Sequence, residues 1–171
     1  GEISVGATVV FILCCGVIFV GACGLLNRVC LYLSPIALVW SAIYSYSKRF
    51  TWLCHYILGS VLGLAPIAGW IAYKPEFNLV FVLLGLGVMF WVAGFDILYA
   101  AQDVDFDRSQ NLKSIPARFG LEPAFGYAAF SHVNTVIFFA LAGLAFGARW
   151  FYFVAWAIVS LILVVEHFII S

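Results

Sequence analysis

Six long apolar runs, separated by polar connections, constrain this chain more than any other feature of its sequence. Each run is close to the ~20 residues that a helix needs to cross a bilayer. They cover roughly residues 3–25, 30–46, 52–73, 78–101, 122–146 and 150–170. The runs are continuously apolar rather than alternating, which favours helices over the strands of a membrane barrel. We therefore predict an all-α, polytopic membrane helical bundle of about six helices, forming a single domain over 1–171.

The composition agrees with a lipid environment, because 65% of the residues are hydrophobic and only 9% are charged. Lysine and arginine concentrate in the cytoplasmic loops of membrane proteins. Five basic residues fall in one set of alternate connections and three in the other, namely Lys48, Arg49, Arg108, Lys113 and Arg118 against Arg28, Lys74 and Arg149. We expect a multi-pass protein of the inner (plasma) membrane with the first set facing the cytoplasm. The lipid bilayer is a partner and nucleic acid is not.

Small residues within the runs are interpreted as packing positions. The five cysteines form no Cys-x-x-Cys pair, so we expect small apolar core residues and neither disulfides nor zinc. Two pairs of glycines stand one turn apart, Gly59 with Gly63 and Gly143 with Gly147. Such pairs let membrane helices approach closely.

An acidic segment at the end of the fourth run is the strongest indication of chemistry. Four of the eight acidic residues lie between Phe95 and Asp107. If the run stays helical, one face carries Asp96, Tyr99, Asp103 and Asp107, which we call the acidic strip. Asp105 would face away from it, in a solubilising role.

The last two carboxylates of the strip suggest a metal site. Asp103 and Asp107 lie one turn apart and repel each other unless a cation is present. Acidic groups are also unfavourable near a helix C-terminus, so their clustering there calls for a compensating charge. Mg²⁺ commonly binds one or two protein carboxylates together with substrate phosphates. The competing interpretation is that these residues merely cap a helix or lie in a solvated loop.

Basic residues are expected at the same end of the bundle as the acidic strip. Lysine and arginine beside carboxylates and a metal can bind a diphosphate. Lys48 and Arg49 fall in one loop, and Arg108, Lys113 and Arg118 in the next connection on that side. Taken singly, each is equally well explained by membrane topology alone.

These segments resemble the UbiA superfamily of intramembrane aromatic prenyltransferases. Asp96-Ile-Leu-Tyr-Ala-Ala-Gln-Asp103-Val-Asp-Phe-Asp107, followed by Lys113-Ser114-Ile-Pro116-Ala-Arg118-Phe119-Gly120, is similar to that family's second aspartate-rich motif and the loop after it. Tyr44-Ser-Tyr-Ser-Lys48-Arg49-Phe-Thr51 resembles its Tyr-x-x-x-Lys-Arg-x-Thr segment, and Glu166-His167 its helix-ending pair. The 4-hydroxybenzoate polyprenyltransferase branch is the most similar.

The resemblance implies Mg²⁺-dependent transfer of a polyprenyl group from polyprenyl diphosphate to an aromatic acid, in ubiquinone or menaquinone biosynthesis. It implies that Asp103 and Asp107 bind Mg²⁺ and that Asp96 and Tyr99 line the reaction pocket. It also assigns diphosphate binding to the basic loops and a neighbouring serine: Lys48, Arg49, Lys113, Ser114 and Arg118. A dihydroxynaphthoate-type acceptor is the alternative to 4-hydroxybenzoate.

The resemblance also implies that the chain is an internal piece, holding helices three to eight of nine. The family's first aspartate motif would precede Gly1, so we expect the piece alone to be inactive. The three histidines, His55, His132 and His167, show no metal spacing and are interpreted as satisfied polar residues at helix ends. Two other classes remain open, a CDP-alcohol phosphotransferase and an ion-coupled transporter.

Overall fold

The computed structural model describes residues 3–170, and these form helices and connections without any strand. Six helices are long and apolar enough to span a membrane. They are α1 (Val5–Leu26), α2 (Arg28–Ser47), α3 (Cys54–Tyr73), α4 (Leu79–Gln102), α7 (Leu121–Phe146) and α8 (Trp150–Ile170). Two short helices, α5 (Val104–Ser109) and α6 (Ile115–Phe119), lie between α4 and α7. The predicted all-α membrane bundle is confirmed.

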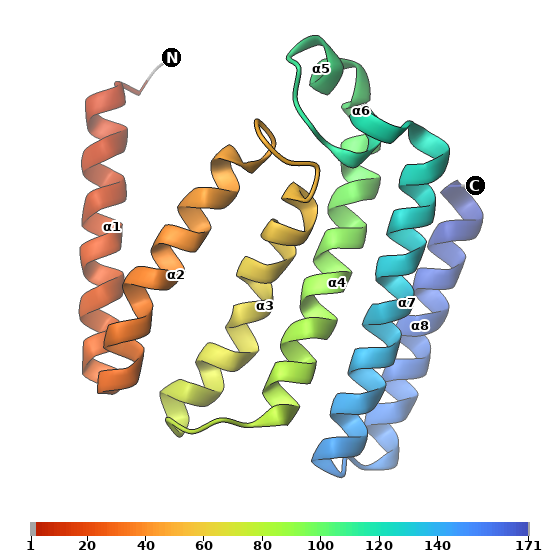
Figure 1. The fold of residues 1–171 in the computed structure, drawn as a ribbon. Coiled ribbons are helices and arrows are strands. Elements are labelled where there is room, and N and C mark those ends of the chain that lie inside the picture. Colours follow the sequence, from red (N-terminus) through yellow and green to blue (C-terminus); the bar gives the residue numbers. More distant parts are fainter. Residues whose placement is uncertain (1–2, 171) are drawn as a thin grey trace.

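The spanning helices alternate in direction, so their connections gather at two ends (Figure 1). The α2–α3 connection and the α5–α6 segment lie at the same end of the bundle. The five basic residues predicted to share one side are therefore together at that end, which we call the loop end.

Polar side chains begin several helices, and Asn27, the residue before α2, accepts from the backbone N–H of Cys30 at 2.9 Å.

The packing centre is formed by α3, α4 and α7, with α6 at its loop end. A small cluster of buried residues there includes Ile97, Ile115 and Ala128. The outer helices bury far less, and α1 has no buried residue among those described. The site residues are thus mounted on the most closely packed part of the chain.

Glycines explain how closely the central helices approach. A methyl group on Gly59 would collide with the backbone carbonyl of Met89, and one on Gly63 with the backbone of Gly85. The predicted packing role of this pair is confirmed, and so is that of Gly143, which abuts the ring of Tyr152. Gly147 is different. A methyl group placed on it would meet no atom within 4 Å, and its φ of 67° at the end of α7 makes it a left-handed helix cap.

The cysteine prediction is only partly right. All five thiols are free, but only Cys30 and Cys54 are buried. Cys14 and Cys15 are exposed on α1, where an apolar side chain can face lipid as well as protein. Hydrophobicity therefore does not distinguish core from lipid-facing positions in such a helix.

Candidate active site at the loop end of the bundle

The acidic strip is not one continuous helical face. Helix α4 ends at Gln102, and Asp103 forms the junction at which α5 begins. The break places Asp105 and Asp107 in the first turn of a new helix, where carboxylates are favourable, instead of at the C-terminus of α4, where they are not. The expectation of a single strip is therefore wrong, and its members divide between two helices.

Asp103 and Asp107 remain one turn apart in space. The backbone N–H of Asp107 donates to the carbonyl of Asp103 at 2.8 Å, as in a regular helix. Their surroundings differ, because Asp107 is 2% exposed whereas Asp103 is exposed. Asp105 is also exposed, which agrees with its predicted solubilising role.

Asp107 is held by a lysine from the opposite loop. The ammonium of Lys48, the residue after α2, lies 3.3 Å from Asp107 Oδ2. The same lysine accepts the backbone N–H of Lys113 through its carbonyl at 2.7 Å. The Lys113 ammonium donates to the carbonyl of Phe50 at 3.4 Å. These contacts join the α2–α3 connection to the segment before α6, as the grouping of basic residues predicted.

The other predicted diphosphate ligands lie at the same end but make different contacts. Arg49 is exposed, with its guanidinium 6.0 Å from the centre of the Tyr46 ring. Arg118 is exposed as well, 5.2 Å from the ring centre of Phe119. Ser114 is fully buried, and its hydroxyl caps α6 by accepting from Ala117 N–H at 3.4 Å. In this conformation the Ser114 hydroxyl is an N-cap of α6.

Further along α4 from the loop end, Asp96 and Tyr99 border the same cavity. It has a volume of about 330 Å³ and is lined as well by Trp91 of α4 and Leu58 of α3. Tyr99 is 63% exposed, and the Asp96 side chain is 25% exposed. The cavity is almost entirely apolar, with the carboxylate as its charged group.

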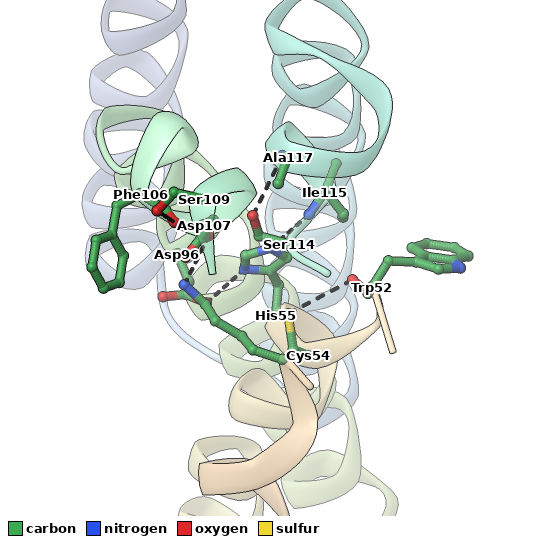
Figure 2. A network of polar contacts seen from close by, with 11 residues as sticks. Trp52, Cys54, His55, Asp96, Phe106, Asp107, Ser109, Ser114, Ile115 and Ala117 are labelled. Atoms are coloured by element: carbon green, nitrogen blue, oxygen red, sulfur yellow. Dashed lines mark hydrogen bonds and ion pairs between the residues drawn. The ribbon is translucent and has the colours of Figure 1, made fainter. Parts of the chain in front are cut away.

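Asp96 has a partner that sequence reasoning missed. His55 Nδ1 lies 2.6 Å from Asp96 Oδ2, and His55 Nε2 accepts the backbone N–H of Ile115 at 3.2 Å (Figure 2). His55 is a satisfied polar residue near a helix start, as predicted. The sequence could not reveal the partners, which are 41 and 60 positions away.

The other two histidines come together between α7 and α8. His132 Nδ1 and His167 Nε2 are 3.0 Å apart, and Glu166 Oε2 lies 3.8 Å from His132 Nδ1. His132 is in the middle of α7 rather than at a helix end, so that expectation is wrong. The pair borders an apolar cavity of about 600 Å³.

Could this end of the bundle hold Mg²⁺? Among residues 3–170, no three His, Cys, Asp or Glu side chains form a group that could hold a metal by themselves. A Mg²⁺ ion that arrives with a diphosphate needs only one or two protein carboxylates. Asp103 and Asp107, whose backbones lie one helical turn apart, are the two carboxylates at this end that could supply those ligands.

Comparisons with known proteins identify the family of this chain. The sequence model of the UbiA prenyltransferase family matches residues 1–171. The chain belongs to this family. A UbiA homologue from Aeropyrum pernix K1, solved in its apo form, superposes with a TM-score of 0.89 at 30% identity, over 98% of this chain and 64% of that one. Family membership and the six apolar helices make the chain a multi-pass membrane protein.

Curated relatives in the UbiA family carry a specific name. The 4-hydroxybenzoate octaprenyltransferase of Escherichia fergusonii is 29% identical over 133 residues, covering 78% of this chain and 45% of the relative. The mitochondrial 4-hydroxybenzoate polyprenyltransferase of Arabidopsis thaliana is 31% identical over 128 residues, covering 74% of this chain and 31% of the relative. The chain thus spans less than half the length of either relative.

Proposed function

We propose that the full-length protein transfers a polyprenyl group from polyprenyl diphosphate to an aromatic acid of the 4-hydroxybenzoate type, as a step of ubiquinone or menaquinone biosynthesis. The observation that carries this proposal is that, at the loop end of an apolar bundle, Lys48 contacts both the carboxylate of Asp107 and the backbone N–H of Lys113. The names of the similar proteins support the 4-hydroxybenzoate acceptor. A dihydroxynaphthoate acid is the alternative acceptor.

The diphosphate end of the reaction is assigned to the loop end. Lys48, Arg49 and Lys113 supply positive charge for the departing diphosphate, and charge-assisted hydrogen bonds of this kind are strong. Asp103 and Asp107 would hold Mg²⁺, which when bound neutralises further charge on the diphosphate oxygens. We assign Ser114 to capping α6 rather than to direct contact, because its hydroxyl is buried and already bonded.

The acceptor end is assigned to the cavity on α4. When the allylic C–O bond breaks, the electron pair leaves with the diphosphate, and an allylic cation remains for the aromatic ring carbon to attack. The cavity around Tyr99 and Trp91 is lined by apolar side chains, and an apolar surrounding would keep water away from that cation in the full-length protein. Asp96 offers a carboxylate that can accept a hydrogen bond from the hydroxyl of the aromatic acid. Transfer of the ring proton to the released diphosphate then restores aromaticity.

The charge distribution supports a proposed placement in the membrane. Five of the eight basic residues lie at the loop end and three at the opposite end. Basic loops are retained on the cytoplasmic side. We propose that the protein lies in the inner (plasma) membrane and that the site opens toward the cytoplasm.

Product formation by the full-length protein in lipid nanodiscs tests the proposal. The reaction contains labelled polyprenyl diphosphate with 4-hydroxybenzoate or 1,4-dihydroxy-2-naphthoate, and either Mg²⁺ or EDTA. Asp107→Asn should lower the rate about 100-fold, as loss of a charge-stabilising group in a reaction centre does. Asp105→Asn, an exposed carboxylate on the same helix, is the matched control and should change little. Activity that survives both EDTA and Asp107→Asn would contradict the proposal.

A further inference from the structure

His55 joins the two ends of the candidate active site. Its ring is fully buried in the first turn of α3, and both of its nitrogens are engaged. One nitrogen meets Asp96 on α4 and the other meets the amide of Ile115, the first residue of α6 (Figure 2).

The hydrogen bonds determine where the ring proton lies. A backbone N–H can only donate, so His55 Nε2 receives the Ile115 bond through its lone pair. The ring proton is therefore on Nδ1 and is donated to Asp96 Oδ2 at 2.6 Å. This is the tautomer that orients a carboxylate, in the way that paired histidines and carboxylates orient each other in other sites. One oxygen of Asp96 is held, while its side chain still reaches the cavity.

The other nitrogen anchors the segment that carries Lys113. Ile115 follows Ser114, whose hydroxyl caps α6, and Lys113, whose N–H is bonded to the Lys48 carbonyl at 2.7 Å. Lys48 in turn contacts Asp107. A single buried ring is thus the link between the wall of the cavity and the basic loop end.

We propose that His55 is a positioning residue with two separable effects. Its Nδ1–H fixes the Asp96 carboxylate for the hydroxyl of the aromatic acid, and its Nε2 fixes the Ile115 amide and with it the Lys113 segment for the diphosphate. This assignment rests on the proposed function. His55 itself touches neither substrate, since it is fully buried.

Two conservative variants separate these effects. Asparagine places its amide near the position of Nδ1, so His55→Asn keeps a donor for Asp96 and loses the acceptor for Ile115. Glutamine reaches the position of Nε2, so His55→Gln keeps the acceptor for Ile115 and loosens Asp96. Both variants are made in the full-length protein, and their thermal unfolding is compared with that of the wild type.

Steady-state kinetics should then divide by substrate. For His55→Asn, we expect the KM for polyprenyl diphosphate to rise about fivefold, the size of one neutral hydrogen bond, with a smaller change for the aromatic acid. For His55→Gln, we expect kcat/KM for the aromatic acid to fall about tenfold or more, because a bond to a charged group is lost. In the Asp96→Asn background, His55→Gln should cause little further loss of kcat/KM for the aromatic acid, because His55 acts on that substrate through Asp96. Equal effects of both variants on both substrates, or no effect, would overturn the proposal.

Amide exchange gives a readout that does not depend on activity. In the wild type the Ile115 amide is bonded to His55 and should exchange slowly, and segment 113–119 should exchange faster in His55→Asn but not in His55→Gln. If the wild type makes no product with any aromatic acid, the proposed function fails, and this exchange pattern shows separately whether His55 anchors α6. Equal exchange in the two variants would refute the anchoring.

Discussion

Two histidine-centred clusters lie inside the same bundle, and they are built differently. In the loop-end cluster, both ring nitrogens of His55 have partners, one on α4 and one on α6. In the α7–α8 cluster, His132 contacts His167 through Nδ1, but its buried Nε2 finds no hydrogen-bond partner of good geometry among residues 3–170. A fully bonded buried group has one preferred position, whereas a partly bonded one can shift.

Glycines packed near the two clusters also differ in whether they contact backbone or side-chain atoms. Gly59 lets α3 rest on the backbone carbonyl of Met89 in α4, the helix that carries Asp96. A methyl group on Gly94 would instead collide mainly with the ring of His132, which also borders the large cavity between α7 and α8, and would lie 3.2 Å from the carbonyl of Ala128. Backbone contacts cannot yield without moving a helix, and a side chain beside a cavity can. The loop-end cluster therefore has the rigid support that a reaction centre requires.

The largest effect is expected where the rigid support is broken. Gly59→Ala inserts a methyl group against a backbone carbonyl and should destabilise the protein by about 3 kcal/mol, at the upper end of overpacking costs. Gly94→Ala should cost less, because the His132 ring can move into the neighbouring cavity. Thermal unfolding in detergent measures both variants. Gly69→Ala on α3, which has nothing within 4 Å, is the control and should be nearly neutral. Equal midpoints for Gly59→Ala and Gly94→Ala would remove the contrast.

A smaller effect is expected from breaking the ion pair at the loop end. Lys48→Met leaves the buried Asp107 carboxylate without its cation and should cost about 2 kcal/mol, less than a fully buried pair because the Lys48 side chain is 33% exposed. Adding Asp107→Asn should recover most of this stability but no activity. A double-mutant cycle on the unfolding free energy measures the coupling. Additive losses would show that the two side chains do not interact.

The smallest effect is expected in the α7–α8 cluster. His167→Phe removes the partner of His132 Nδ1 and should cost about 1 kcal/mol, the value of one hydrogen bond. Its effect on prenyl transfer should be well below that of either His55 variant. Phe168→Leu, at a position 78% exposed on the same helix, controls for general changes in α8. A loss of turnover by His167→Phe as large as that of His55→Gln would place chemistry in both clusters.

The fold was largely predictable because its determinants are local. The apolar runs predicted all six spanning helices to within a few residues, since each run alone satisfies the length that a bilayer requires. The break at Asp103 was not predicted. The apolar pattern up to Gln102 is the same whether the helix continues past that residue or ends there and a new helix begins with the acidic residues.

The site was predictable only in its composition. The basic and acidic segments were expected at one end, and Lys48 with Asp107 joins them. The pairing of His55 with Asp96 depends on how α3 and α4 pack, which no spacing along the chain encodes. The same is true of His132 and His167, which are 35 positions apart.

The position of the bound diphosphate substrate tests whether the reaction takes place at the loop end. A polyprenyl diphosphate analogue with a photoreactive group beside its allylic carbon is cross-linked to the full-length protein in nanodiscs with Mg²⁺, and the labelled residues are found by mass spectrometry. Excess unlabelled polyprenyl diphosphate is the control for specific labelling. We predict competed labels at 48–58 and 91–113, around the Lys48–Asp107 pair and the Asp96 cavity. Competed labels confined to the α7–α8 cavity, at 125–137 and 160–170, would contradict it.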